Sequence, residues 1–208
     1  MFKLTRQKLL TLAAGVVIAG AGSVAGAATA ALYTDTGTST GNSFAAGTVA
    51  VRLTDANETS LSSVAASVSG TTMAPGDSTT GYIEVSNTGS LAQRYAVSTT
   101  DTTAAGAANT AMSSALTVGV DSRASGSACT ASQGGAGQTS VKAAGTTLQS
   151  LAIGDPTTGA QAGDRALAAG AAERLCFYVT LPSGTGNASQ GGTASYTFTF
   201  AAEQTANN

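Results

Sequence analysis

The stretch Arg174–Leu181, RLCFYVTL, is one of the two strongest strand patterns in this 208-residue chain. Its residues fall on two faces: Leu175, Phe177, Val179 and Leu181 on one, and Cys176, Tyr178 and Thr180 on the other. Such alternation is typical of a β-strand with one buried face. Pro182 follows at once and ends the strand, because proline has no backbone N–H to give to a ladder.

A second strong strand is predicted over Thr193–Phe200. Its three aromatic residues, Tyr196, Phe198 and Phe200, share one face, and threonines occupy the other. An aromatic stripe of this kind indicates core rather than a ligand platform, and a threonine face is typical of a solvated side of a sheet. Tyr82 and Tyr178 lie on the opposite faces of their strands and are predicted to be exposed contact residues.

Two neighbouring segments further upstream alternate in the same way. Ser78–Ser86 places Ile83 and Val85 on one face, and Gln93–Thr99 resumes the pattern after the turn-forming run Asn87–Ser90. Because the connection is short and rich in turn residues, we expect the two segments to pair as adjacent strands.

Weaker patterns complete the organisation. Ala74–Asp77 reads as a turn, because proline presets one central dihedral and glycine accepts the next. The segment Thr100–Ser114 has one bulky residue, Met112. Its pattern is compatible with either a short helix or a loop. The remaining segments are strands at Val49–Leu53, at Leu116–Val120 and around Leu148 and Leu151, a surface loop at Ala124–Ser140, and a turn region at Pro156–Gly163. Seven to nine short strands and no long helix predict an all-β, antiparallel β-sandwich.

Residues 1–30 read as a helical signal peptide. The cations Lys3, Arg6 and Lys8 precede a ten-residue apolar core, and small residues follow. Two A-x-A sites place cleavage in the region of Ala27, Ala28, Ala30 and Ala31. The alternative is an uncleaved membrane anchor, but the bulky apolar part is about half of the roughly 20 residues that a spanning helix needs. We therefore expect a secreted protein of about 178 residues, which contacts the membrane only through the uncleaved signal.

The charge content excludes some classes of partner. Only 10% of the residues are charged, and the full-chain net charge of −2 becomes −5 once the three cations of the signal are removed. A chain with this balance lacks the basic footprint of nucleic-acid binding or of adhesion to anionic lipid. Because few residues are charged, like-charge repulsion between copies of the chain is weak and offers little opposition to self-association.

Two cysteines, Cys129 and Cys176, lie in the exported part. In an oxidising compartment a disulfide is the default, and two separate reduced thiols are the alternative. A disulfide would close a loop of 47 residues, for which the chain-entropy model gives about 4 kcal/mol of stabilisation. No C-x-x-C motif is present, so a redox role is not expected.

Four motifs occur in an order that resembles the TasA/camelysin family. They are Ala31–Asp35 followed by Asn42–Val49 (NSFAAGTV), the turn Met73–Ser78 (MAPGDS), the turn Val85–Leu91 (VSNTGSL), and the last strand within Asn187–Gln204. The motifs span most of the mature chain. Each is weak alone, and their common order carries the resemblance.

The resemblance implies a jelly-roll domain over residues 42–208, exported through a dedicated signal peptidase. It further implies an exported structural subunit of cell-surface or biofilm-matrix fibres, in which segment 31–41 completes the sheet of the next copy. The donated strand would carry Leu32, Tyr33, Thr34 and Asp35, with Leu32 and Tyr33 as apolar anchors. Partners would be the chain itself and other matrix proteins. The alternatives are a monomeric surface adhesion or fibre-accessory module, and a tail that folds onto its own domain.

Catalysis finds no support in the residues. The chain contains no histidine, so an H-E-x-x-H zinc site and a Ser–His pair are both excluded. No calcium loop and no phosphate-binding glycine loop is present. We therefore expect no catalytic, metal or cofactor residues, and a secreted peptidase is the third and least supported hypothesis.

Overall fold

The computed structural model describes residues 47–54, 70 and 72–206; the predicted signal peptide (1–30) and donor segment (31–41) lie outside this part. In chain order the elements are β1 (Val51–Thr54), β2 (Ser78–Asn87), β3 (Gln93–Asp101), α2 (Ala107–Ala115), β4 (Thr117–Ala124), β5 (Thr139–Thr147), the 3-10 turn η2 (Leu148–Ser150), β6 (Ala152–Ile153), β7 (Arg165–Leu167), β8 (Ala172–Thr180), the 3-10 turn η3 (Asn187–Ser189) and β9 (Tyr196–Gln204).

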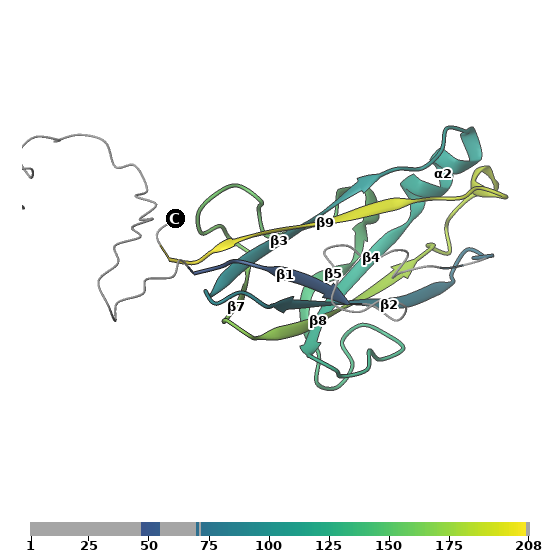
Figure 1. The fold of residues 1–208 in the computed structure, drawn as a ribbon. Coiled ribbons are helices and arrows are strands. Elements are labelled where there is room, and N and C mark those ends of the chain that lie inside the picture. Colours follow the sequence, from purple (N-terminus) through teal and green to yellow (C-terminus); the bar gives the residue numbers. More distant parts are fainter. Residues whose placement is uncertain (1–46, 55–69, 71, 207–208) are drawn as a thin grey trace, which may run out of the picture. The chain divides into compact units, whose positions relative to one another are not determined.

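The strands form two antiparallel sheets (Figure 1). The first sheet has the order β1-β2-β8-β4-β5. In the second sheet β3 is central: β9 pairs along its whole length on one side, and β6 and β7 pair with separate parts of it. The prediction of an all-β, antiparallel sandwich is thus confirmed at the level of sheets and strand direction.

The core lies between the sheets and is centred on β8. Phe177 is fully buried and packs edge-on against Phe198 of β9, with ring centroids 5.1 Å apart. In the same layer, the ring centroids of Tyr95 on β3 and Phe200 on β9 are 6.2 Å apart. The predicted strand over Arg174–Leu181 is therefore confirmed, and the aromatic stripe of β9 packs against the core as expected.

The expected pairing of Ser78–Ser86 with Gln93–Thr99 is wrong. Both segments are strands, but β2 pairs with β1 and β8, whereas β3 pairs with β6, β7 and β9. The connection carries the chain from one sheet to the other. Alternation shows which face of each strand is buried, and it cannot tell whether two buried faces belong to one sheet or to two facing sheets.

The turn at Asn87–Ser90 is confirmed, and its first residue joins two segments of backbone by hydrogen bonds. The buried Asn87 side-chain amide donates to three backbone carbonyls, at 2.8 Å (Leu91), 3.1 Å (Ala168) and 3.2 Å (Leu167). A Cβ on Gly89 would lie 2.3 Å from the carbonyl oxygen of Thr48. Glycine is therefore required where the chain entering β1 crosses this turn.

Three weaker predictions have mixed outcomes. The strand expected around Leu148 and Leu151 is wrong, because the buried Leu148 begins the 3-10 turn η2 and the buried Leu151 follows it. The pairing segments are β5 before this turn and β6 after it. The first strand is predicted to begin at Val49, but it begins at Val51, and the Val49 side chain is 38% exposed. Of the two possibilities left open for Thr100–Ser114, the structure has the helix α2, formed by an alanine-rich run of high helix propensity.

Candidate functional site

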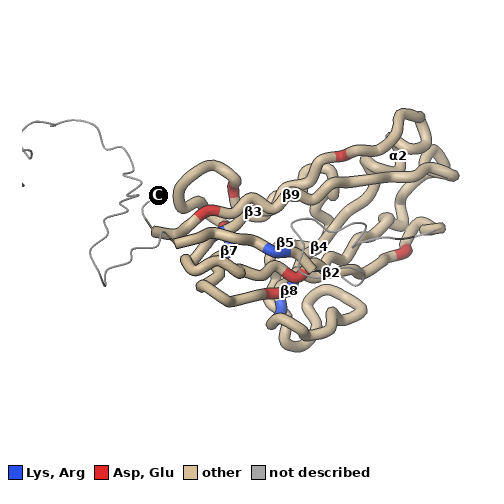
Figure 2. Tube along the Cα trace, viewed as in Figure 1, with Lys and Arg blue, Asp and Glu red and all other residues tan. Residues whose placement is uncertain are grey.

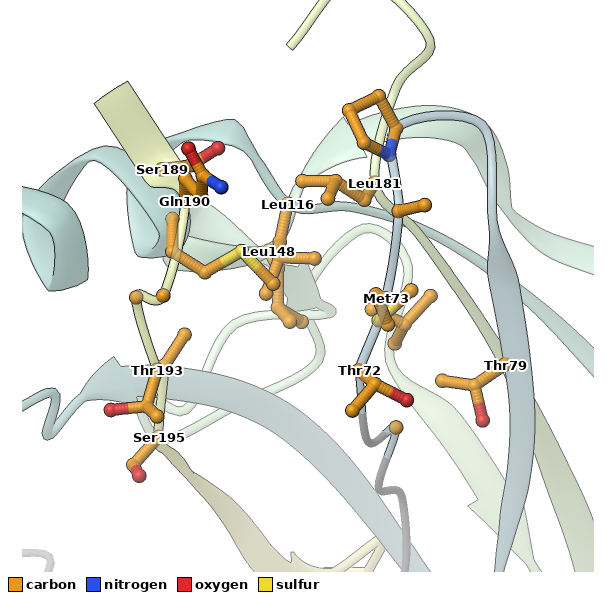
Figure 3. Close-up of a pocket in the computed structure, with 18 of the residues that line it drawn as sticks. Thr72, Met73, Thr79, Leu116, Leu148, Leu181, Ser189, Gln190, Thr193 and Ser195 are labelled. Atoms are coloured by element: carbon orange, nitrogen blue, oxygen red, sulfur yellow. The ribbon is translucent and has the colours of Figure 1, made fainter. Parts of the chain in front are cut away.

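An apolar groove opens at one end of the sandwich, where the first residues of β2 and of β9 face each other. Its volume is about 1140 Å³, above the roughly 300–1,000 Å³ of ordinary small-molecule pockets. Figure 3 shows Met73 and Thr79 on one wall, Thr193 and Ser195 on the other, and leucines at the back. The apolar side chains that line it include Met73, Met112, Leu116, Leu148, Leu181 and Phe198.

The bottom of the groove is continuous with the hydrophobic core. Leu148 and Leu181 are 3% and 2% exposed and belong to the core cluster, against which Met73 and Met112 pack as half-buried side chains. Hydroxyl and amide groups, such as those of Thr193 and Gln190, line the rest of the groove. An apolar floor with polar groups around it suits an elongated, partly apolar occupant.

Among the described residues, each sheet has a strand on this side of the sandwich with part of one edge unpaired. In the first sheet β1 pairs only with residues 84–87 of β2, so within the described residues Thr80–Ile83 has no strand on that side. In the second sheet β9 pairs with β3 alone, so the other side of Tyr196–Ala202 has no strand among the described residues either. Open edges present backbone N–H and C=O groups to any extended segment that enters.

The predicted turn at Ala74–Asp77 is confirmed and fixes the Met73 wall. Asp77 N donates to the carbonyl of Ala74 at 2.9 Å, and the Asp77 carboxylate accepts from Ala74 N at 2.7 Å. Gly76 has φ +99°, which side-chain-bearing residues rarely adopt, and its N–H donates to the carbonyl of Leu181 at 2.7 Å. The turn thereby holds Met73 against the end of β8.

The opposite wall is tied to α2 and β3. The Tyr196 hydroxyl donates to the carbonyl of Ser113 at 2.5 Å, and Thr193 N donates to the side-chain carbonyl of Asn109 at 2.9 Å. Burial, together with the negative charge of Asp101, raises the pKa of Tyr196 to about 12. Hydrogen bonds, first of all from Thr103 and next from Gln149, lower the pKa of Asp101 to about 2.

No charged residue is among the described lining residues of the groove, although Asp77 and Asp101 lie close to its two walls. Figure 2 shows blue and red positions side by side around β2 and β8, and a few isolated red positions elsewhere in the described chain. Three ion pairs involve them: Arg94–Glu203, Arg165–Glu173 and Arg174–Glu84, the last at 3.0 Å. Arg174 also stacks over the Tyr82 ring at 4.0 Å. The described lining of the groove therefore offers apolar and uncharged polar contacts rather than charged ones.

Cys129 and Cys176 form a disulfide that ties the loop over residues 125–138 to the outer face of the first sheet. The loop covers Asp121, which is fully buried and accepts hydrogen bonds from Gly134 N at 2.6 Å and from the Gln138 amide at 3.0 Å. It also covers Tyr178, which is 6% exposed, so the prediction of an exposed Tyr178 is wrong. Alternation could not anticipate a loop that buries the second face of a strand.

The remaining predicted site residues fall outside the described part of the chain. These are the cleavage-region residues Ala27, Ala28, Ala30 and Ala31 and the donor-strand residues Leu32, Tyr33, Thr34 and Asp35. Among residues 47–54, 70 and 72–206 there is no group of three or more His, Cys, Asp or Glu side chains that could hold a metal ion. No helix in those ranges has the length and hydropathy needed to cross a bilayer.

Sequence reasoning missed the groove itself. Its walls come from segments far apart in the chain, and no local pattern marks them. The available signal was slight: Met73 and Met112 are isolated long side chains in runs of Ala, Ser, Thr and Gly. No family model matches the chain, and a search of the curated proteins gives no match either.

Proposed function

We propose that this protein is an exported structural subunit of cell-surface or biofilm-matrix fibres, in which the groove receives segment 31–41 of a neighbouring copy. The observation that carries the proposal is the groove with its apolar floor, close to β2 and β9, each of which has an edge without a partner strand among the described residues. The groove has the volume for a polypeptide segment.

Strand addition accounts for this combination of features. An extended segment placed between β2 and β9 would hydrogen-bond to open backbone groups, and its inward side chains would cover the leucines of the groove floor. Main-chain bonds would supply affinity, and the groove would select small or apolar side chains at alternate positions. The small number of charges leaves little repulsion between copies.

The pattern of segment 31–41 indicates which of its faces enters. Successive side chains of a strand point to opposite sides, so the adjacent residues Leu32 and Tyr33 cannot both face the groove. Asp35 shares a face with Tyr33, and burial of its carboxylate in an uncharged groove would be unfavourable. We therefore assign Leu32 and the threonines that follow at even positions to the inward face.

The positions of the chain entry and of the groove favour head-to-tail assembly. The described chain enters beside the turn at residues 87–90, where Leu91 N donates to the carbonyl of Thr48 at 3.2 Å. The groove lies near Thr79, at the other end of β2. At about 3.3 Å per residue the two points are about 25 Å apart. A tail that leaves one end and docks at the other end of the next copy builds an open chain of subunits.

The resemblance to the TasA/camelysin family supports the same conclusion from the sequence. We propose that the two antiparallel sheets are a jelly roll over residues 42–208, and that residues 1–30 are removed on export. The partners are other copies of the chain, the signal peptidase during export and other matrix proteins, with no cofactor and no catalytic residue. The Cys129–Cys176 disulfide is compatible with an oxidising, extracellular location.

The test compares two single variants of the mature protein, Leu32→Asp and Tyr33→Asp, which carry the same substitution at adjacent positions. Electron microscopy at rising protein concentration should show filaments for the wild type and for Tyr33→Asp, but none for Leu32→Asp. Deletion of 31–41 should also abolish filaments, while circular dichroism still shows a folded β-protein. Filaments from the deletion variant would contradict the donor assignment.

The same series separates the alternatives. A wild-type protein that stays monomeric at every concentration would favour a monomeric adhesion or accessory module, whose groove is filled by its own chain. A casein assay of the pure protein, with and without chelator, addresses the peptidase hypothesis. Chelator-sensitive cleavage would overturn the assignment of a purely structural role.

A further inference from the structure

All the oxidisable sulfur of the described chain, outside the disulfide, lies in the groove. The sequence contains three methionines, of which Met1 belongs to the predicted signal, and two cysteines. The cysteines are bonded to each other. Met73 and Met112 remain, and both line the groove.

The two thioethers occupy different walls. Met73 precedes the turn into β2, and a Cβ on Gly70 would lie 2.9 Å from its sulfur, so the side chain lies close against the backbone there. Met112 belongs to α2, one residue before Ser113, whose carbonyl holds the Tyr196 hydroxyl. Both side chains are half-buried: they contact the core on one side and border the groove on the other.

We propose that Met73 and Met112 form an oxidation-sensitive modification site, and that their conversion to sulfoxides by peroxide weakens strand binding in the groove. This inference rests on the proposed function, because its consequence is a loss of assembly. In the reaction the O–O bond of hydrogen peroxide breaks, one oxygen atom is transferred to each thioether sulfur, and the remainder of the peroxide leaves as water. The sulfur is oxidised by two electrons, and the peroxide is reduced by two.

The physical effect follows from the position of the two sulfurs. A thioether is apolar and adapts its shape to its neighbours, whereas a sulfoxide carries a strong dipole that needs a hydrogen-bond donor. Beside Leu116 and Leu148 an incoming strand would bury that dipole against apolar groups. A buried unsatisfied polar group of this kind weakens binding by about ten- to a hundredfold.

Occupancy of the groove should in turn protect the sulfurs. A docked strand would stand between peroxide and both thioethers, so assembled subunits should be oxidised more slowly than free ones. Methionine sulfoxide reductases restore the thioether, so the modification is reversible in principle. The site would thus make the assembly of free subunits, more than the stability of existing fibres, responsive to oxidants.

The experiment uses the mature Leu32→Asp chain, which keeps the groove and cannot donate its own tail, with a matched Met73→Leu/Met112→Leu version. Leucine is close to methionine in volume and cannot be oxidised. Each is treated with hydrogen peroxide while folded, oxidation at each methionine is followed by peptide mass spectrometry, and affinity for a synthetic peptide of residues 31–41 is measured. We expect both methionines to be oxidised, affinity to fall at least tenfold, and the leucine version to be unaffected.

Resistance of both methionines to peroxide in the folded protein would overturn the proposal, and so would full oxidation with unchanged affinity. If the untreated protein fails to bind the peptide, the proposed function fails instead. The modification site is then judged by a fluorescent dye that binds exposed apolar surface. A fall in dye binding on oxidation, absent in the leucine version, would support it, and equal dye binding before and after oxidation would overturn it.

Discussion

The two sides of the sandwich differ in how their outermost strands are built. On one side β5 ends the first sheet, and its ladder with β4 is interrupted by register shifts at Val118/Val120 and Val120/Asp121. Gly145 in β5 has φ +83°, and the Lys142 amine donates to the carbonyl of Ala152 at 2.8 Å. On the other side the first sheet ends with the short strand β1, which pairs only with residues 84–87 of β2, and the second sheet ends with β9. β2 and β9 have regular ladders, and their first residues border the groove of about 1140 Å³.

The difference teaches where association can occur. Bulges, glycine and an edge lysine are the devices by which natural sheets prevent further strand addition, and β5 carries all three. β9 carries none of these devices, and β2 carries only one of them, Gly81. Under the proposed function, the groove side rather than the β5 side is the one that accepts another chain.

The largest expected effect comes from the core beneath the groove. Phe177→Ala should lower the free energy of unfolding by about 3–5 kcal/mol, because the ring is fully buried against Phe198. On β5 the matched truncation Val141→Ala should cost less than about 1 kcal/mol, because that side chain is only half-buried. Urea unfolding measures both. Equal losses would show that the two sides do not differ in how they hold the core.

The next effect concerns the loop that covers the outer face of the first sheet. The double variant Cys129→Ser/Cys176→Ser should lose about 2–4 kcal/mol, because a 47-residue loop is no longer closed in the unfolded chain. Addition of a thiol reductant should destabilise the wild type by a similar amount and leave the variant unchanged. A variant as stable as the wild type in non-reducing buffer would refute this account of the loop.

The turn at residues 87–90, which holds the entry to β1, is expected to contribute less. Asn87→Ala removes the donors to one buried and two partly buried carbonyls and should cost about 1–3 kcal/mol. Asn87→Asp should cost more, because a carboxylate would face the same carbonyls. Thermal unfolding gives the ranking, and an aspartate variant as stable as the wild type would contradict it.

The smallest effect is a dependence of stability on alkaline pH. The pKa of Tyr196 is raised from 10.0 to about 12 in the folded protein, so folding favours the neutral hydroxyl. This stabilisation is present in full below pH 10 and is lost as the pH rises through about 12. Tyr196→Phe should flatten the decline in urea midpoint over that range. If the urea midpoint of the variant falls with pH as steeply as that of the wild type, groups other than Tyr196 cause the fall.

The fold was predictable from sequence where apolar and polar residues alternate sharply. β2, β8 and β9 have such patterns, and the confirmed disulfide followed from cysteine number and export context. β5 escaped prediction because TSVKAAGTT offers little apolar contrast, as is usual for an exposed edge. The assignment of β2 and β3 to different sheets depends on tertiary packing, which a local pattern does not contain.

The candidate site was less predictable than the fold. Its walls are the ends of elements that lie far apart in the chain, from Met73 to Phe198, and each contributes one or two side chains. Burial of Tyr178 depends on a loop some 40 residues upstream, which places Gln138 within hydrogen-bonding distance of its hydroxyl. Such proximities arise only once the sheets have packed together.

The most direct test of strand acceptance is a titration of the isotope-labelled, mature Leu32→Asp chain with a synthetic peptide of residues 31–41, followed by NMR. The account predicts saturable shifts at Met73, Leu181 and Phe198 around the groove, and no change at Lys142 and Gly145 on β5. Absence of binding, or shifts confined to β5, would contradict the claim that the groove is the open side of the molecule.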